Sequence, residues 1–142
     1  MLEVKGIDNG IVIDHIGSGK GIKIFNLLFA STENPVVLLM NVKSQLLGSK
    51  DIIKVENVYE VDLDLLGLID PKITVNVIKE GKLSSKTKAT IPTTIKGGMK
   101  CHNPRCITHS DDYAIPEFTL VKANGKLEYE CSFCEEITIY KL

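Results

Sequence analysis

Two cysteine pairs organise the C-terminal third of the chain: Cys101-His102-Asn103-Pro104-Arg105-Cys106 and Cys131-Ser132-Phe133-Cys134. They hold all four cysteines of the 142-residue protein, as C-x4-C and C-x2-C separated by the 24 residues 107–130. Two such knuckles point four thiolate sulfurs at one zinc ion, with Zn–S distances of about 2.3 Å. Four soft ligands that leave no position for water predict a structural site and not a catalytic one.

Other interpretations of the cysteines are weaker. Two disulfides would require an oxidising compartment, and residues 1–5 show no secretory hydrophobic region. A mixed Cys/His set is a subtler rival, because His109 follows Cys106 at C-x2-H spacing and His102 adjoins Cys101. The second complete pair makes four sulfurs the simpler set. The predicted ligands of one structural Zn²⁺ are therefore Cys101, Cys106, Cys131 and Cys134.

Composition and charge argue against several classes of protein. The chain is 44% apolar and 25% charged with a net charge of −1, and no apolar run approaches the roughly 20 residues of a membrane span. Residues 97–142 hold four lysines and one arginine against seven acids, a balance of −2. A zinc ribbon with this negative charge is a poor candidate for binding the phosphate backbone of a nucleic acid. No nucleophile–base set or open metal position points to an enzyme, and the cytoplasm is the expected location.

The N-terminal region begins with two expected strands. Residues 3–16 alternate around a turn at Asp8-Asn9-Gly10, where Asn-Gly favours a hairpin. Asp14 and His15 interrupt the apolar run as the second strand ends. Either these polar residues simply mark the solvated end of a strand, or the Asp14 carboxylate lies at a sheet edge where it accepts hydrogen bonds from a ligand.

A glycine-rich stretch, Gly17-Ser18-Gly19-Lys20-Gly21, follows this strand. It lacks the G-x4-G-K-[ST] register of a phosphate-binding loop. Ser18 is an available N-cap, and Ile22, Phe25, Leu28 and Phe29 recur at helical spacing. We therefore expect a helix of about ten residues lying on a sheet.

Further elements complete a β-α-β-β-α-β-β order. A central strand is expected over residues 35–42, a strand over 50–57, a helix over 61–69, and strands over 73–78 and 82–89. The predicted fold class is α+β: an N-terminal sandwich of a mainly antiparallel sheet with two helices, followed by a small all-β, zinc-ribbon-like domain. The predicted boundaries are 1–92 for the first domain, 93–98 for a linker with a Gly97-Gly98 hinge, and 99–142 for the zinc domain.

Lysines recur at alternate positions in two of these strands. Lys50, Ile52 and Lys54 share one face of the strand over 50–57, and the strand over 82–89 holds Lys82, Lys86 and Lys88. Either group fits a site for a phosphate chain or a plain solvated face. The spacing alone leaves both interpretations open.

Five segments together carry a resemblance to a known family. They are Gly10-Ile11-Val12-Ile13-Asp14-His15-Ile16, Lys50-Asp51-Ile52-Ile53-Lys54-Val55-Glu56-Asn57, Thr74-Val75-Asn76, Cys101-x4-Cys106-Ile107-Thr108-His109 and Cys131-x2-Cys134-Glu135. In this order the chain resembles, over essentially its whole length, the regulatory chain of aspartate carbamoyltransferase. One knuckle alone would be weak evidence, but the ordered set is highly specific.

The resemblance implies a non-catalytic regulatory subunit. In that family the N-terminal domain binds nucleotide effectors, generally ATP, CTP and sometimes UTP, and the zinc domain docks on the catalytic chain that makes carbamoyl aspartate for pyrimidine biosynthesis. Regulatory chains pair through their N-terminal domains and bridge catalytic trimers in a dodecamer. We therefore expect nucleotide effectors, a second copy of this chain and a catalytic chain as partners, and neither nucleic acid nor membrane.

The resemblance also assigns roles to residues that the spacing leaves open. Lys54 and Lys86 match family positions that hold the phosphates and ribose, with Lys50 placed to assist. Asp14, with His15 beside it, matches the carboxylate near the base and sugar. The expected lining around the base is Val4, Gly6, Ile7, Val12, Ile52, Asn76, Ile78 and Leu83.

The sequence departs from the family pattern at several points. Residues 79–82 lack the aromatic that some relatives place near the base, which bears on effector preference. Arg105 stands where a small amide is common, and Glu136 where a basic residue is often found. The last two changes fall on the expected docking surface for the catalytic chain.

Overall fold

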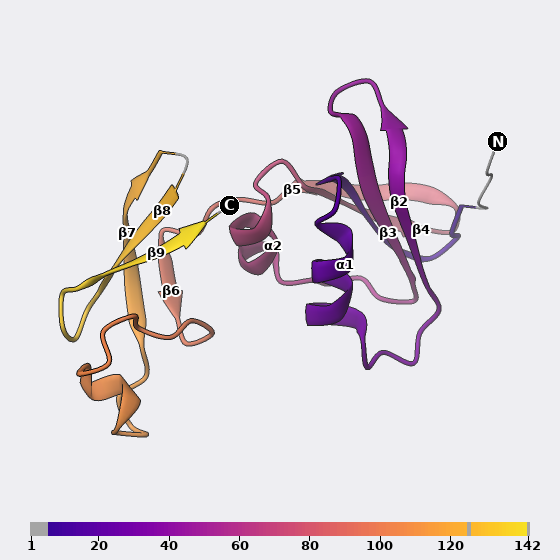
Figure 1. Ribbon diagram of the computed structural model, residues 1–142. Coiled ribbons are helices and arrows are strands. Elements are labelled where there is room, and N and C mark those ends of the chain that lie inside the picture. The colour runs from indigo at the N-terminus through magenta and orange to yellow at the C-terminus, as the bar shows by residue number, and fades with distance from the viewer. Residues whose placement is uncertain (1–5, 125, 142) are drawn as a thin grey trace. The chain divides into compact units, whose positions relative to one another are not determined.

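The chain folds into two compact units, Met1–Thr90 and Ile91–Leu142 (Figure 1). The computed structural model describes residues 6–124 and 126–141. The first unit contains a five-stranded sheet with helices, and the second a four-stranded sheet with the cysteine cluster. The predicted fold class, mainly antiparallel sheet with two helices followed by an all-β zinc-ribbon-like domain, is confirmed.

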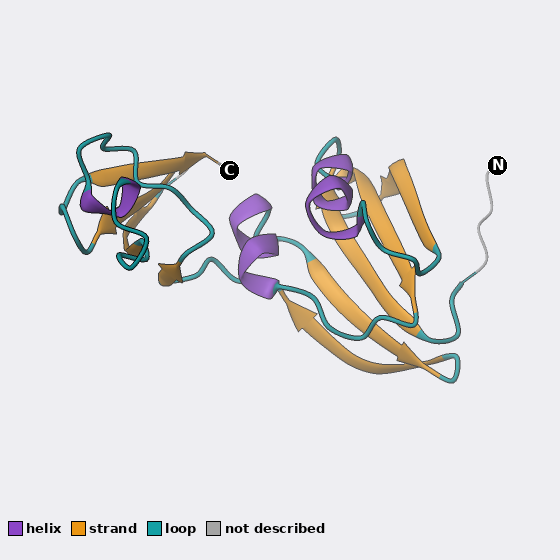
Figure 2. Cartoon of the chain, turned by 90° about the horizontal axis from the view of Figure 1, so that it is seen from below, coloured by secondary structure: helices purple, strands orange, loops and turns teal. Residues whose placement is uncertain are grey.

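The first sheet is antiparallel, in the order β2-β3-β1-β4-β5. Figure 2 shows helix above one face of this sheet. The elements of the unit are β1 (Gly10–Gly17), α1 (Gly21–Ile24) continuing as a π-helical turn (Phe25–Phe29), β2 (Val36–Ser44), β3 (Gly48–Glu56), α2 (Leu63–Ile69), β4 (Thr74–Lys79) and β5 (Lys82–Lys88).

Alternation along the inner strands separates a core face from an open face. Every second residue is apolar and buried against the helices: Ile11 and Ile13 on β1, Ile53 and Val55 on β3, and Val75 on β4; Ile16, beyond the register shift in β1, is buried as well. Ile24 and Phe29 come from the first helix, and Leu66 and Ile69 from α2. Burying a side chain of this size stabilises the fold by about 1.5–3 kcal/mol each. The residues between them, including Val12 and Lys54, lie on the opposite face.

The first helix begins later than the sequence predicts. Its N-cap is Lys20, whereas the Ser18 hydroxyl donates a hydrogen bond to Asn41 Oδ1, so the prediction of Ser18 as N-cap is wrong. The buried Asp51 carboxylate accepts the backbone N–H groups of Gly19 and Gly21 instead, at 3.0 and 2.9 Å. An added Cβ at Gly21 would lie 2.8 Å from the Asp51 side chain, which explains the glycine.

The predicted apolar stripe of this helix is correct only in part. Phe29 is buried, and Phe25 and Leu28 pack against the core, but Ile22 is 49% exposed and Ile24 takes the buried position. The π-helical turn at Phe25–Phe29 changes the residue spacing. Simple 3.6-residue periodicity therefore assigns Ile22 to the wrong face.

The strand expected at the centre of the sheet lies at its edge. β2 pairs only with β3 in the described sheet, and Val37 and Met40 are 37% and 45% exposed. A continuous apolar run is typical of a strand buried on both faces, which is why the sequence favours a central position. Residues 3–5 of the expected first hairpin lie outside the described residues.

The second unit is a single antiparallel sheet in the order β6-β7-β8-β9. Its elements are β6 (Thr94–Lys96), a 3₁₀ turn (Ile107–His109), β7 (Glu117–Ala123), β8 (Lys126–Cys131) and β9 (Ile137–Lys141). Phe118, Leu127 and Tyr129 form its buried centre, and the Tyr129 hydroxyl donates to the Pro92 carbonyl at 2.8 Å.

The structure places a paired strand inside residues 93–98, the interval expected to be a linker. β6 pairs with β7 from Thr94↔Thr119 to Lys96↔Glu117. Gly97 and Gly98, both at φ +69°, follow this strand, and the Gly97 N–H donates to the Pro116 carbonyl at 2.7 Å. These glycines therefore turn the chain within the second unit, and the division between units lies at Thr90 and Ile91.

Candidate functional site

The four cysteines meet in one cluster. Their ligand atoms all lie within 4.8 Å of one another, with Sγ–Sγ distances of 3.6 Å for Cys101–Cys134 and 3.7 Å for Cys106–Cys131. Four sulfurs about 2.3 Å from a central ion would be about 3.8 Å apart, whereas a disulfide is about 2.05 Å long. All four are free thiols, so their arrangement fits a tetrahedral metal centre.

Backbone hydrogen bonds shape the two knuckles. In the first, the Asn103 carbonyl accepts the Cys106 N–H at 3.1 Å and the Asn103 side chain accepts the Arg105 N–H at 3.1 Å. In the second, the Cys131 carbonyl accepts the N–H of Glu135 at 2.9 Å, and Glu135 has a positive φ of 64°. Each turn therefore brings its two sulfurs near one point.

The histidines near the knuckles contribute to the surroundings of the cluster. His109 Nε2 lies 2.9 Å from the Cys101 carbonyl oxygen, so this ring nitrogen is used in a hydrogen bond to the backbone. The His102 N–H donates to the Thr138 hydroxyl at 3.0 Å, and its side chain is exposed. The four sulfurs remain the simplest ligand set.

The protein environment acts unequally on the thiols. Hydrogen bonds from the Thr108 hydroxyl, 3.2 Å from Cys106 Sγ, and from the Thr108 backbone N–H lower the pKa of Cys106 to about 6. Burial raises the pKa of Cys101 to about 12 in the absence of a metal. A cation at the centre of the cluster favours the thiolate form of every ligand. Thr108 is a neighbour that cysteine spacing alone does not predict.

The second candidate site is a row of side chains on the open face of the first sheet. Val12 lies opposite Lys54 on β3 and opposite Asn76 on β4, and Asn76 lies opposite Lys86 on β5. Directly opposed residues of antiparallel strands project from the same face. We call this row, together with Asp14, two residues beyond Val12 on β1, and Lys50, four residues before Lys54 on β3, the basic face.

A second row lies beside the first. Asp14 is opposite Thr74, and Thr74 is opposite Lys88. Lys50 Nζ lies 2.9 Å from Asp14 Oδ1, with both side chains less than one-fifth exposed. Burial alone would raise the pKa of Asp14, but the Lys50 ammonium and the His15 N–H outweigh it and lower that pKa. Asp14 is therefore held as a carboxylate.

His15 marks an irregularity at the end of β1. It has φ 58°, uncommon for a residue other than glycine, and the β1–β3 register shifts between Ile13 and Ile16. Its N–H donates to Asp14 Oδ1 at 2.6 Å, and its Nδ1 lies 2.9 Å from the Thr74 hydroxyl oxygen. Such bulges re-aim side chains at functional sites.

Asn76 carries an acceptor without a partner. Its Oδ1 is buried and has no hydrogen-bond partner among the described residues. A buried polar atom left unpaired costs about 1–3 kcal/mol. Its position between Val12 and Lys86 indicates where a donor from a ligand would be stabilised.

The other predicted lining residues vary in exposure. Ile52 and Ile78 are half-buried, Leu83 is 59% exposed, and Gly6 and Ile7 precede β1. Val4 lies outside the described residues. The spacing left Lys88 open as part of a phosphate site or of a solvated face, and the resemblance gave it no role; its two-residue spacing from Lys86 places both on one face.

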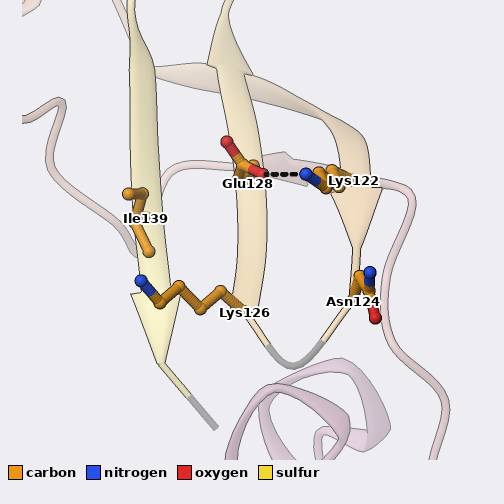
Figure 3. Close-up of a pocket in the computed structure, with 5 residues that line it drawn as sticks. All are labelled: Lys122, Asn124, Lys126, Glu128 and Ile139. Atoms are coloured by element: carbon orange, nitrogen blue, oxygen red, sulfur yellow. Dashed lines mark ion pairs between the residues drawn. The ribbon is translucent and has the colours of Figure 1, made fainter.

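Two open cavities lie elsewhere. One of about 480 Å³ in the second unit is lined by Lys122, Asn124, Lys126, Glu128 and Ile139 (Figure 3). The Lys122 ammonium in it lies 3.9 Å from the Glu128 carboxylate. Another cavity, of about 320 Å³, is lined by Tyr59, Glu60, Val61, Leu63, Val75, Val77, Ser85 and Thr87. Its strand residues, Val75 and Val77 on β4 and Ser85 and Thr87 on β5, alternate with the residues of the basic face and so project from the other face of the sheet. Neither cavity includes a predicted site residue.

Comparison with known proteins accounts for both units. A family model described as the allosteric domain of the aspartate carbamoyltransferase regulatory chain matches residues 2–90, and one described as the metal-binding domain of the same chain matches residues 93–141. Among residues 6–124 and 126–141, no helix is both long and apolar enough to span a bilayer.

Curated regulatory chains are similar in sequence to this chain over nearly its full length. An aspartate carbamoyltransferase regulatory chain of Clostridium botulinum (strain Hall) is 50% identical over 96% of this chain and 94% of its own. Regulatory chains of Clostridium acetobutylicum and Methanococcus vannielii are 46% and 42% identical, over 96% and 95% of this chain and 94% and 91% of theirs.

Proposed function

Because the chain belongs to the family of aspartate carbamoyltransferase regulatory chains, we propose that it is a non-catalytic subunit that binds nucleotide effectors. The observation that carries the proposal is the basic face, where lysines from β3 and β5 lie on either side of a carboxylate and an unpaired amide oxygen from β1 and β4. ATP, CTP and UTP are the proposed effectors. Their binding regulates the catalytic chain of pyrimidine biosynthesis.

The chemistry of the basic face suits a nucleoside triphosphate. Lys54 on β3 and Lys86 on β5 lie on either side of Val12 and Asn76, with the two strands β1 and β4 between them, so their ammonium groups can neutralise a phosphate chain laid across these strands. Asp14 accepts hydrogen bonds from a sugar or base. The Asn76 amide oxygen suits an exocyclic amino group, which ATP and CTP carry and UTP lacks.

The bound metal is proposed to be Zn²⁺. Four sulfurs at tetrahedral spacing are the ligand set that Zn²⁺ takes in structural sites. The ion would hold the two knuckles together. The second unit is then the part of the chain that docks on a catalytic chain, with Arg105 and Glu136, both exposed, beside the knuckles.

The proposed assembly pairs two regulatory chains through their first units and joins them to catalytic trimers in the cytoplasm. Effector binding then favours one of two states of the assembly. Coupling of this kind is typically 1–3 kcal/mol and is reciprocal between sites. Substrate and nucleotide must therefore alter each other's affinity by the same factor.

Titration calorimetry on the enzyme assembled with its catalytic chain tests this proposal. We expect ATP and CTP to bind, and a bisubstrate analogue on the catalytic chain to change their dissociation constants by about 5- to 150-fold. Activity assays with each nucleotide identify activators and inhibitors. Absence of nucleotide binding, or identical affinity with and without the analogue, would refute the regulatory role.

A further inference from the structure

Asp70 is a buried carboxylate at the C-terminal end of α2, outside the basic face. It is 4% exposed. Its Oδ2 accepts the backbone N–H of Gly17, the last residue of β1, at 2.9 Å, and its Oδ1 accepts the Lys72 N–H at 3.0 Å. Lys20 Nζ lies 3.8 Å from Oδ2. One side chain thus ties the end of β1 to the end of α2.

The strand held by Asp70 also carries the carboxylate of the basic face. Asp14 and its bulge at His15 lie three and two residues before Gly17 on β1. On β3, Lys50 is the register partner of Gly17 and pairs with Asp14 at 2.9 Å. Any displacement of Asp14 and Lys50 by a ligand therefore acts directly on the backbone group that Asp70 holds.

From Asp70 two short routes lead to the last residue of the first unit. Along the backbone, the Asp70 carbonyl accepts the Ile73 N–H at 3.3 Å, and the Ile73 carbonyl accepts the Ala89 N–H at 2.8 Å. Through α2, Gly67 packs so closely on Thr90 that an added Cβ would lie 1.8 Å from its carbonyl oxygen. Thr90 precedes the start of the second unit at Ile91.

We propose that Asp70 is a positioning residue that couples the basic face to the junction at Thr90. The inference rests on the regulatory function proposed above and names the contact that transmits it within the first unit. A buried carboxylate that links two elements favours their moving together, because the charge-assisted hydrogen bond between them is lost if one element moves alone. Ligand binding at β1 then shifts α2 and Thr90 together.

A structural anchor would have the same contacts, so the test needs a matched control on the same helix. Asp62 caps the other end of α2, where its side chain accepts the Leu65 N–H at 3.1 Å. It is exposed, and within residues 6–124 and 126–141 no hydrogen bond or ion pair joins its side chain to β1. Asp62→Ala weakens α2 without cutting the link to β1.

The experiment measures CTP dissociation constants for the enzyme assembled with its catalytic chain, with and without a bisubstrate analogue, beside thermal unfolding. For Asp70→Ala we expect CTP binding without the analogue within about threefold of wild type, and a coupling factor lower by about 2- to 30-fold. Asp62→Ala lowers the unfolding temperature but keeps the wild-type coupling factor. If Asp70→Ala does not fold, Asp70→Asn, which preserves side-chain size but removes the charge, replaces it in the same coupling measurement.

Each outcome bears on one claim. Wild-type coupling in folded Asp70→Ala or Asp70→Asn enzyme would overturn the role of Asp70 and leave the regulatory function standing. Equal loss of coupling in Asp62→Ala would also overturn it, because the effect would then follow helix stability. Absence of coupling in the wild-type enzyme would refute the regulatory function itself.

Discussion

Lys54 gives the most direct test of the basic face at the scale of one residue. It is half-buried and lies in the middle of the sheet, opposite Val12. Lys54→Ala removes one charge-assisted contact to a phosphate group, each worth about 1.5–3 kcal/mol. We expect ATP and CTP to bind about 10- to 100-fold more weakly by calorimetry, with an unchanged unfolding temperature.

Lys72→Ala is the matched control for charge. Lys72 is an exposed lysine in the turn after α2, so its loss changes the net charge of the same unit equally. We expect wild-type nucleotide affinity for this variant at moderate salt. Equal weakening by the two substitutions would indicate a general electrostatic effect and would remove Lys54 from the binding site.

Asp14 predicts a pH dependence of stability with a definite sign. Its pKa is lowered in the folded protein by the Lys50 ammonium and the His15 N–H, which outweigh the effect of burial. The stabilisation is therefore present above the unfolded-state pKa, about 3.9, and is lost as the pH falls through the lower folded-state pKa.

Asp14→Asn isolates this contribution from other acid effects. The cysteines of the proposed metal centre also protonate in acid, but this loss is common to both proteins. We expect the difference in free energy of unfolding between wild type and Asp14→Asn to be constant near neutral pH and to shrink below about pH 4. Denaturant titrations across this range measure it, and a difference that grows in acid would contradict the assigned ion pair.

Secondary-structure elements were predictable where a local signal matched the final packing. Alternation at Ile11, Ile13, Ile53 and Val55 predicts strands whose buried faces the structure confirms. The helix expected over residues 61–69 is present as α2, which begins at Leu63 with Asp62 as its N-cap. The edge position of β2 was not predictable, because an apolar sequence does not specify which strands will pair beside it.

The candidate sites divide in the same way. Cysteine spacing indicates a metal centre because knuckles are local structures, and two-residue lysine spacing indicates a shared strand face. Asp51 and Asp70 gave no such signal. Asp51 accepts the N–H of Gly21, 30 residues away in the chain, and Asp70 accepts the N–H of Gly17, 53 residues away. Long-range hydrogen bonds to buried carboxylates leave no periodic pattern.

Gly67 tests close packing at the scale of an element. It lies in α2, where alanine is normally favoured over glycine by about 1 kcal/mol. Here an added Cβ would lie 1.8 Å from the Thr90 carbonyl oxygen, which is backbone and cannot rotate away. We expect Gly67→Ala to destabilise the protein by about 1–3 kcal/mol in chemical denaturation.

Asp64→Ala provides the control on the same helix. Asp64 is exposed in the first turn of α2, and substitution there is expected to change stability by at most about 0.5 kcal/mol. A stable Gly67→Ala variant would show that α2 can move away from Thr90 at little cost.

The whole molecule consists of units with very different means of stabilisation. Among its described residues the first has a core cluster of twelve buried residues, most of them from strands and helices. The second has one sheet with a small buried centre around Phe118, Leu127 and Tyr129, beside three buried cysteines. A unit of about 50 residues with so little core usually needs a metal or disulfides to fold.

Removal of the metal is therefore expected to unfold the second unit alone. A strong zinc chelator would withdraw the proposed Zn²⁺ from between the two knuckles, and the binding energy of a structural Zn²⁺ is folding energy. Hydrogen exchange followed by mass spectrometry measures the effect on each segment. We expect amides of β7, β8 and β9 to exchange rapidly after chelation, while β1, β3 and β4 keep their protection.

Restoring Zn²⁺ should return the protection, and Cys134→Ser should mimic chelation because it removes one of four ligands. The first unit, with its own core, should still bind ATP or CTP in both cases, but the assembled enzyme should lose its response to them. This follows because the proposed nucleotide-binding residues and the cysteines lie in different units. Loss of protection throughout the chain would show that the first unit depends on the metal for its folding.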